Sequence, residues 1–260
     1  MTSGQAPCVL ITIPISHYCE KARWALERAG VAYAEERHVQ GVHILASRRA
    51  GGHGTVPVLI CEDGVLAESE AIVRWADARL PPERRLFLDA DHPEVAALCR
   101  RLDAGLGPDA RRLMYAHMLP HRDLLLSCNN TGVPAWEDQL LRRLWPAMTP
   151  FAAKRLGLGP RTIESDTPRV RAEFDAIGER LADGRRYLCG DRFTAADLTF
   201  AALAAAVLVP PEYGTPLPQP DALPEPVASG VREFRAHPAG AFALALFRDE
   251  RHATAAVAAA

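Results

Sequence analysis

The sequence lacks two features that would place it in a specialised class. It has no excess of charge of one sign, since 30 Lys and Arg residues against 32 Asp and Glu residues leave a formal net charge of −2. Binding to nucleic acid or to an anionic membrane surface draws on a basic excess, so neither partner is expected. It also has no long apolar run: the longest, Leu198 to Val209, contains Thr199 and is far shorter than a membrane span. We interpret that run as a buried helix.

Lysine and closely spaced cysteine pairs are scarce as well. Only two of the 30 basic residues are lysines, and the arginines are scattered among acids, which indicates compositional bias more than a dedicated anion-binding surface. The six cysteines show no tight pairing, a pattern typical of unbridged thiols in a reducing cytoplasm. Residues 1–7 contain no basic segment followed by an apolar core, so no signal peptide is predicted. The expected location is the cytoplasm.

Up to residue 80 the chain alternates strand-like and helix-like runs. Short apolar runs rich in β-branched residues predict strands at 8–13, 31–38, 55–61 and 65–67. Helical periodicity predicts helices at 17–29 and 68–80, and residues 41–50 are ambiguous. The Asp63-Gly64 pair signals a hairpin turn between the last two strands. This order predicts a small α/β domain with a mixed sheet over residues 1–80.

After a Pro-rich linker at 81–92, the chain predicts helices alone, so residues 93–260 are expected to form an all-helical domain. A long helix is predicted from Glu94 to Met118, kinked at Gly105, Gly107 and Pro108. Further helices are predicted at 135–156, 168–183, 194–208 and 227–248. The segment 210–226 contains seven prolines and is expected to be a loop. The fold class is therefore α/β followed by all-α.

One helix start is strongly specified. Thr194 and Asp197 have the spacing of a capping box, and Phe193 and Leu198 that of a hydrophobic staple. The run behind them is apolar. The pattern predicts a buried helix whose role lies in folding.

Chemistry is expected at the turn between the first strand and the first helix. Ser16-His17-Tyr18-Cys19 follows an apolar strand and opens a helix that ends at Gly30. Backbone N–H groups and the helix dipole favour negative charge at that position. A hydroxyl and a thiol there indicate thiolate chemistry. His17 and Cys19 lack the further ligands that a zinc site needs, so no metal is predicted.

Four motifs recur in the order and spacing of one known family. The turn from Ser16 to Cys19 is similar to the C-x-x-C helix start of glutaredoxins. Val56-Pro57 resembles a cis-proline pair, Glu68-Ser69 a γ-glutamyl site, and 190–197 a C-terminal capping box. Together they resemble the cytosolic glutathione transferase superfamily, in a serine-type, bacterial-type form with a thioredoxin-like first domain. The resemblance extends over nearly the whole chain.

This resemblance implies glutathione as co-substrate and a homodimer as the assembly. Glu68 would accept from the γ-glutamyl ammonium, while Ser69 and nearby N–H groups would donate to its carboxylate. A cis bond at Pro57 would turn the Val56 backbone toward the peptide. Many family members carry a lysine just before the Val-Pro pair, where this chain has Thr55. His53 is therefore expected to bind the glycyl carboxylate, with two further candidates, Arg49 and His43.

Two groups of the turn compete for the chemistry. In the first interpretation Ser16 donates a hydrogen bond to the thiolate of glutathione, which attacks a hydrophobic electrophile. In the second Cys19 reacts, and the protein is a glutathione lyase or thiol reductase. The first position of the C-x-x-C pattern is serine here, which favours Ser16, and Tyr18 is a further donor candidate. A non-catalytic binding or scaffold protein remains a third possibility, because a fold does not fix an activity.

The acceptor pocket is expected between the two domains, on the long helix. The candidates there are Arg112 and Tyr115, and beyond them His117 and Trp136. The identity of the electrophile and the role of the Pro-rich segment are left open by the sequence.

Overall fold

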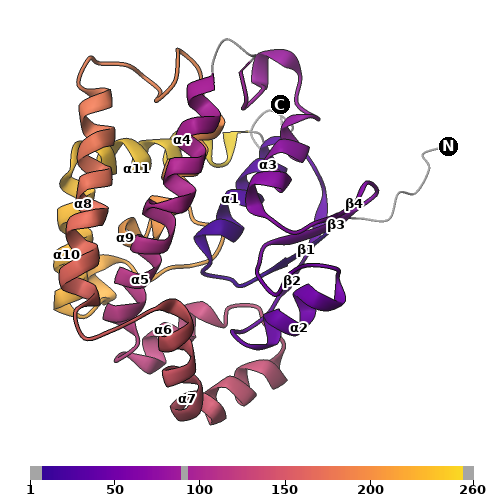
Figure 1. The fold of residues 1–260 in the computed structure, drawn as a ribbon, viewed down its shortest axis with the longest axis vertical. Coiled ribbons are helices and arrows are strands. Elements are labelled where there is room, and N and C mark those ends of the chain that lie inside the picture. The colour runs from indigo at the N-terminus through magenta and orange to yellow at the C-terminus, as the bar shows by residue number, and fades with distance from the viewer. Residues whose placement is uncertain (1–7, 89–92, 254–260) are drawn as a thin grey trace.

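The structure is a computed structural model that describes residues 8–88 and 93–253. Figure 1 shows a small sheet with its helices beside a larger group of helices, with α6 and α7 below both. The signal-peptide prediction for residues 1–7 and the last four residues of the predicted linker lie outside the described part. The division of the chain into 1–80, 81–92 and 93–260 stays a prediction.

The N-terminal sheet has four strands in the order β2-β1-β3-β4. They are β1 Cys8–Thr12, β2 Tyr33–Arg37, β3 Val58–Cys61 and β4 Gly64–Leu66. β1 runs parallel to β2 and antiparallel to β3, and β3 pairs antiparallel with β4 across the predicted hairpin. The mixed sheet is confirmed, and β1, one of its two inner strands, leads directly into the Ser16 turn.

Three helices accompany this sheet: α1 His17–Arg28, α2 Val42–Arg49 and α3 Ser69–Asp77. α1 packs against α3, and α2 contacts β1. The ambiguous segment 41–50 is thus helical over most of its length. α3 ends earlier than predicted, because the N–H groups of Arg79 and Leu80 turn back to the carbonyls of Ala76 and Asp77.

From Pro82 onward, every regular element in the described part of the chain is helical. The elements are η1 Pro82–Arg84, α4 Pro93–Ala104, α5 Leu106–Met118, α6 Arg122–Asn129, α7 Ala135–Leu156, α8 Thr162–Leu181, α9 Ala195–Leu208, η2 Pro220–Ala222, α10 Glu225–Ala236 and α11 Pro238–Glu250. The predicted α/β plus all-α fold class is confirmed. None of the described helices is long and apolar enough to cross a membrane.

Several helix boundaries differ from the prediction. The long helix is broken at Gly105 into α4 and α5. α6 was not predicted, and α8 begins before Pro168, which lies inside it. The predicted helix at 227–248 is two helices, because His237 takes an extended backbone before Pro238 (φ −67°, ψ 142°) and α11 starts anew there. Proline disfavours the helical conformation for the residue that precedes it.

One hydrophobic core runs through both halves of the chain. The Trp24 ring of α1 lies 5.8 Å from the Phe193 ring and 4.9 Å from the Phe247 ring, centroid to centroid. α9 is almost wholly buried, and its capping box is confirmed: the Thr194 N–H donates to Asp197 Oδ2 at 2.8 Å. Because α1 packs on α9, the C-terminal helices fix the position of the helix that begins after Ser16.

Candidate functional site

Ser16 caps the N-terminus of α1 and closes the turn that leaves β1. Its N–H donates to the Ile13 carbonyl at 3.1 Å, and its Oγ accepts from the Cys19 N–H at 3.4 Å. Because Oγ serves as an acceptor inside the turn, its own hydroxyl hydrogen is available to a second partner. Ser16 is half-buried and lines a cavity. The hydroxyl therefore stands at a helix N-terminus beside a space that can hold a ligand.

The backbone just before Ser16 is held from two sides. The Tyr213 hydroxyl, from the Pro-rich segment, donates to the Ile15 carbonyl at 3.0 Å. The Arg23 guanidinium donates to the Pro14 carbonyl at 3.2 Å. These bonds fix the direction in which the turn presents Ser16.

Arg23 belongs to a buried network of ion pairs. Its guanidinium lies 3.3 Å from Glu20 and 2.7 Å from Glu35, and the other oxygen of Glu20 accepts from Arg251 at 2.6 Å. Burial lowers the pKa of Arg23, but the two carboxylates raise it above its usual value, so the side chain stays charged. Removing one partner of such a buried pair leaves a costly unpaired charge. The network ties α1 to β2 and to the residue that follows α11.

The other two candidates of the turn differ from Ser16, because Cys19 is buried and Tyr18, although it lines the same cavity, uses its hydroxyl within the protein. The Cys19 thiol is fully buried, and burial raises its pKa against the effects of Arg23 and Ser16. The Tyr18 hydroxyl donates to the Asp103 carbonyl at 2.8 Å, and burial raises its pKa to about 12. Cys19 is thus a protonated core thiol, and Tyr18 is anchored to α4.

The Val56–Pro57 peptide bond is cis, as the resemblance implied. Pro57 is buried, whereas Val56 is half-buried and lines the same cavity as Ser16. Val56 precedes the paired residues of β3, whose register with β1 starts at Val58. Its backbone N–H and C=O thus lie beyond the sheet ladder, where an extended peptide can pair with them.

Glu68 and Ser69 lie at the start of α3, close to the turn. Glu68 is exposed, has an extended backbone and makes no side-chain capping bond, and Ser69 is buried at the first helical position. Burial is the largest cause that raises the pKa of Tyr18, and the negative charges of Asp103 and Glu68 raise it further. Glu68 therefore lies near Tyr18, at the beginning of α1. The two residues do not line the cavity of Ser16 and Val56, so their part in the site stays a prediction.

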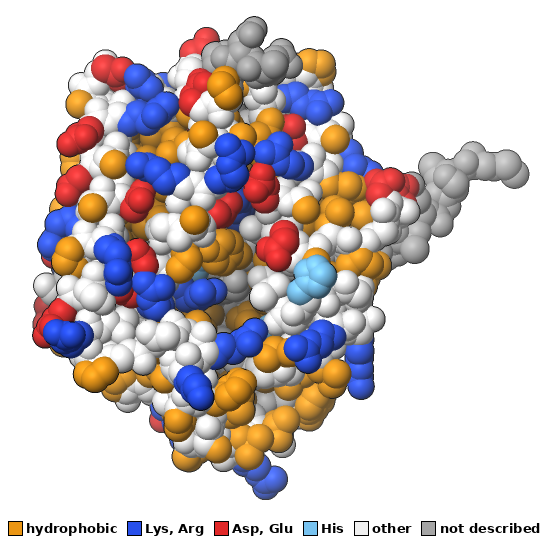
Figure 2. Space-filling view, viewed as in Figure 1, with side chains coloured by type: hydrophobic (Ala, Val, Ile, Leu, Met, Phe, Trp, Pro, Cys, Tyr) orange, Lys and Arg blue, Asp and Glu red, His pale blue; other side chains and the backbone are white. Residues whose placement is uncertain are grey.

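We call the space between these elements the Ser16 cavity. It has a volume of about 180 Å³ and is lined from α1, α2, α5, α7 and the loop before β3. Two arginines reach it, Arg111 of α5 and Arg155 of α7, and no carboxylate among the described residues lines it. Figure 2 shows a hollow near the middle of this face, with Lys or Arg side chains along its rim. The charge of the cavity therefore suits an anionic ligand.

Three residues were predicted as partners of the glycyl carboxylate. Of these, His43 lines the Ser16 cavity, whereas His53 and Arg49 are exposed and do not line it. His43 Nδ1 accepts from the Gly41 N–H at 3.1 Å, and burial lowers the pKa of the ring to about 4. His43 is therefore a neutral hydrogen-bonding group at pH 7. Arg155 was not predicted, because nothing in the sequence of α7 marks which of its arginines faces α2.

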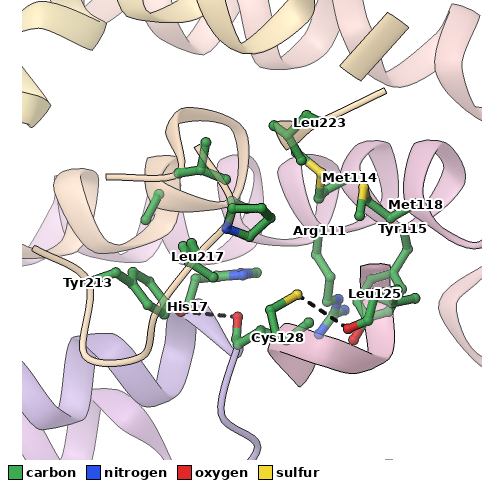
Figure 3. Close-up of a pocket in the computed structure, with 15 residues that line it drawn as sticks. His17, Arg111, Met114, Tyr115, Met118, Leu125, Cys128, Tyr213, Leu217 and Leu223 are labelled. Atoms are coloured by element: carbon green, nitrogen blue, oxygen red, sulfur yellow. Dashed lines mark hydrogen bonds between the residues drawn. The ribbon is translucent and has the colours of Figure 1, made fainter. Parts of the chain in front are cut away.

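A second space, which we call the apolar cavity and which Figure 3 draws, adjoins the first. The two share Ile15, His17, Arg111 and Tyr115. The rest of its lining is mostly apolar and comes from α5, α6, α9 and the segment after α9. Among these residues are Met114, Met118, Leu125, Val209, Leu217 and Leu223. Its volume is about 70 Å³.

The acceptor-pocket residues are only partly where the sequence placed them. Tyr115 lines both cavities, and its hydroxyl accepts from Gln40 Nε2 at 2.8 Å. Arg112 does not line either; it pairs with Asp109 and, at 2.8 Å, with Asp166 of α8. The residue of α5 that lines both cavities is its neighbour Arg111, because successive helical side chains point about 100° apart.

The two outlying candidates also lie elsewhere. His117 lines a separate cavity beside α10, and Trp136 is 59% exposed on α7. Among the described residues, no three His, Cys, Asp or Glu side chains are grouped so that they could hold a metal ion.

A family model described as the glutathione S-transferase N-terminal domain matches residues 10–84, and one described as the C-terminal domain matches residues 134–234. A comparison with curated protein sequences found no significant match.

Solved structures share the fold at low identity. A glutathione S-transferase from Methylobacillus flagellatus KT with glutathione bound is 17% identical, with a TM-score of 0.59 over 95% of this chain and 98% of the other. One from Ceriporiopsis subvermispora in complex with glutathione is 18% identical, with a TM-score of 0.62 over 94% and 98%. A glutathione transferase from Phanerochaete chrysosporium is 18% identical, with a TM-score of 0.61 over 94% and 97%.

The two family models together cover more than half of the chain, in the order that the four motifs predicted. The fold agrees along almost its full length. The chain belongs to the glutathione S-transferase superfamily.

Proposed function

We propose that this protein is a serine-type glutathione transferase that joins the thiolate of glutathione to a hydrophobic electrophile. One observation carries the proposal: the Ser16 hydroxyl, at the N-terminus of α1, and Val56, before the cis-proline, line one cavity between the two domains. A tripeptide whose backbone pairs with Val56 would bring its cysteine sulfur toward Ser16.

The ends of glutathione would be bound on either side of that point. Glu68 makes no capping bond and is exposed, so its carboxylate can accept from the γ-glutamyl ammonium. The first N–H groups of α3 and the Ser69 hydroxyl can donate to the neighbouring carboxylate. For the glycyl carboxylate, Arg155 and His43 line the Ser16 cavity, whereas His53 is exposed on its loop.

The thiolate needs more stabilisation than a helix dipole alone provides. Lowering a thiol pKa by two units from about 8.5 requires ~2.7 kcal/mol. A helix dipole contributes roughly 0.3–1 kcal/mol and up to ~2 in sheltered sites. A hydrogen bond to a charged group contributes about 1.5–3 kcal/mol. The dipole together with the Ser16 hydroxyl is therefore sufficient, and the dipole without it falls short.

In the reaction the thiol proton passes to solvent and the sulfur attacks the electrophilic carbon. A carbon–sulfur bond forms while the leaving group departs with its bonding electrons. The chain's own contribution is to bind, to orient and to stabilise the negative charge. Side chains of the apolar cavity would hold the electrophile next to Ser16.

The alternative that Cys19 reacts has less support. Its thiol is fully buried, and burial raises its pKa, whereas a reactive cysteine needs thiolate character and access. A non-catalytic scaffold remains the competing function, and glutathione turnover separates it from a transferase.

Membership of the family also suggests a cellular location, a physiological role and an oligomeric state. We propose a cytoplasmic protein that acts in detoxification, since all six cysteines are unbridged, as a reducing compartment favours. We also propose a homodimer, which light scattering of the purified chain would test.

The proposed activity is tested with wild type, Ser16→Ala, Cys19→Ala and Glu68→Gln. We expect Ser16→Ala to lose turnover of a generic aryl halide while retaining glutathione binding, and Cys19→Ala to keep turnover. Glu68→Gln should raise the KM for glutathione and leave kcat nearly unchanged, because it weakens binding alone. No glutathione binding by the wild type would overturn the proposal, and binding without turnover would favour the scaffold.

A further inference from the structure

Arg111 stands out among the charged residues near the two cavities. The neighbouring arginine of α5, Arg112, is paired with Asp109 and Asp166. By contrast, the buried Nε atom of Arg111 has no hydrogen-bond partner among residues 8–88 and 93–253. No carboxylate within that part of the chain lines either cavity that Arg111 reaches. Arg111 as a whole is half-buried, but buried polar atoms in proteins are normally hydrogen-bonded, so its Nε has the character of a donor whose partner is a ligand.

His17 provides a second buried polar atom without a described partner at the apolar cavity. Its ring is 4% exposed, and its Nε2 also lacks a hydrogen-bond partner within the described residues. Burial and then the Arg111 charge lower the pKa of His17 to about 3, so the ring is neutral at pH 7. Arg111 is therefore the one full positive charge among the described residues that line the apolar cavity. One positive charge in the cavity matches one anionic group on the ligand.

Arg111 and His17 reach the cavity from different elements. In Figure 3 the Arg111 side chain comes from α5, and the His17 ring comes from the start of α1 beside Tyr213 and Leu217. Around them lie methionine, leucine and valine side chains of the apolar cavity. One water needs about 10–15 Å³ of such space, so a volume of about 70 Å³ admits a group of the size of a small ring.

We propose that the apolar cavity binds an electrophile with an apolar body and one carboxylate-like group, and that Arg111 pairs with this group. This inference rests on the proposed transferase function and names the substrate class. Glutathione also carries carboxylates that could reach Arg111. The apolar residues that line this cavity together with Arg111 favour the electrophile, because a tripeptide's polar ends gain nothing from methionine and leucine side chains. Arg155 and His43 remain on the Ser16 cavity for glutathione itself.

A matched pair of probes tests this assignment: 4-chloro-3-nitrobenzoate and its neutral isostere 4-chloro-3-nitrobenzamide. In both, the thiolate sulfur would bond to the carbon that bears chlorine, and chloride would leave with the bonding electrons. Binding of each probe is measured by calorimetry without glutathione, so that this result does not depend on turnover. The ratio of the kcat/KM values for the two probes is then compared between proteins, which cancels their different intrinsic reactivities.

The variants are Arg111→Met, Arg111→Lys and the exposed control Arg100→Met. We expect wild type to bind the benzoate more tightly than the benzamide. Arg111→Met should reduce that preference about 10- to 100-fold, the range for a hydrogen bond to a charged group. The benzamide affinity should stay within about twofold, since methionine retains much of the apolar stem. Arg111→Lys should restore part of the preference, because it keeps the charge without the guanidinium geometry, and Arg100→Met should change nothing.

Three outcomes would overturn the inference. The first is equal affinity of wild type for the two probes. The second is an unchanged preference in Arg111→Met, and the third is a loss of glutathione affinity in that variant with the probe preference intact, which would assign Arg111 to glutathione. If Arg111→Met does not fold, Arg111→Gln serves in its place, and circular dichroism checks both. A wild type that binds no glutathione would instead contradict the proposed function, and this result is distinct from the three above.

Discussion

The Tyr213 hydroxyl donates a 3.0 Å hydrogen bond to the carbonyl of Ile15, the residue immediately before Ser16. Tyr213 lies in the Pro-rich segment between α9 and α10, nearly 200 positions further along the chain. The Gly214 N–H, next in that segment, donates to Glu20 Oε2 at 3.1 Å. The segment thus holds both the turn and the first helical turn of α1, which gives a structural role to a stretch whose sequence did not indicate one.

Tyr213→Phe should lower kcat of the proposed reaction, because the Ile15 carbonyl loses its donor and the Ser16 turn loosens. A net hydrogen bond of about 0.5–1.5 kcal/mol corresponds to a roughly 2- to 10-fold effect. Tyr187→Phe is the matched control: it removes a 2.7 Å bond to Glu250, away from the turn. Steady-state kinetics of the two variants should differ. Equal losses of activity in both would show that general destabilisation, not positioning, is responsible.

Gly107→Ala should destabilise the fold. A Cβ at Gly107 would lie 2.2 Å from the Tyr18 hydroxyl oxygen and 2.8 Å from the adjoining ring carbon, so α5 or the Tyr18 ring must move. Such overpacking costs about 1–3 kcal/mol, measured as the free energy of unfolding in denaturant. Gly230→Ala, at an open position of α10, should be neutral or stabilising by up to ~1 kcal/mol. A neutral Gly107→Ala would mean that the close approach of α5 to Tyr18 is wrong.

The His17 ring should make stability depend on pH. Its pKa is lowered from 6.5 to about 3, by burial first and by Arg111 second. The unfolded chain therefore binds the proton more tightly, so this contribution is present above pH 6.5 and is lost as the pH falls. Between pH 7.5 and pH 5 the loss is ~2 kcal/mol.

His17→Gln should remove that part of the pH dependence. Unfolding free energies of both proteins are measured across the range, and their difference is plotted against pH. His43, with a pKa lowered to about 4, contributes the same slope to both proteins and cancels in the difference. A difference that does not change with pH would refute the buried, neutral state of His17.

The sequence was most informative where local chemistry sets the structure. The Thr194 and Asp197 capping box, the Asp63-Gly64 hairpin and the strand-to-helix turn at Ser16 each depend on residues within a few positions, and each was predicted. The cis bond at Val56–Pro57 was also predicted, although only through the family resemblance.

Features that depend on tertiary contacts could not be predicted. The choice between Arg111 and Arg112 is set by where α8 places Asp166, and no local pattern in α5 encodes it. Arg155 becomes a cavity residue only because α7 crosses near α2. The contact of Tyr213 with Ile15 joins two distant segments of the chain. Sequence reasoning thus located the turn, but the cations around it required the fold.

The most direct measurement is the pKa of the glutathione thiol when bound to the protein, followed by the ultraviolet absorbance of the thiolate across pH. For wild type, the account predicts a pKa about two units below the ~8.5 of a free thiol. Ser16→Ala should raise the bound pKa by about 1–2 units, the equivalent of one hydrogen bond to a charged group, while Cys19→Ala leaves it unchanged. A bound pKa that is the same in wild type and Ser16→Ala would contradict the role assigned to Ser16.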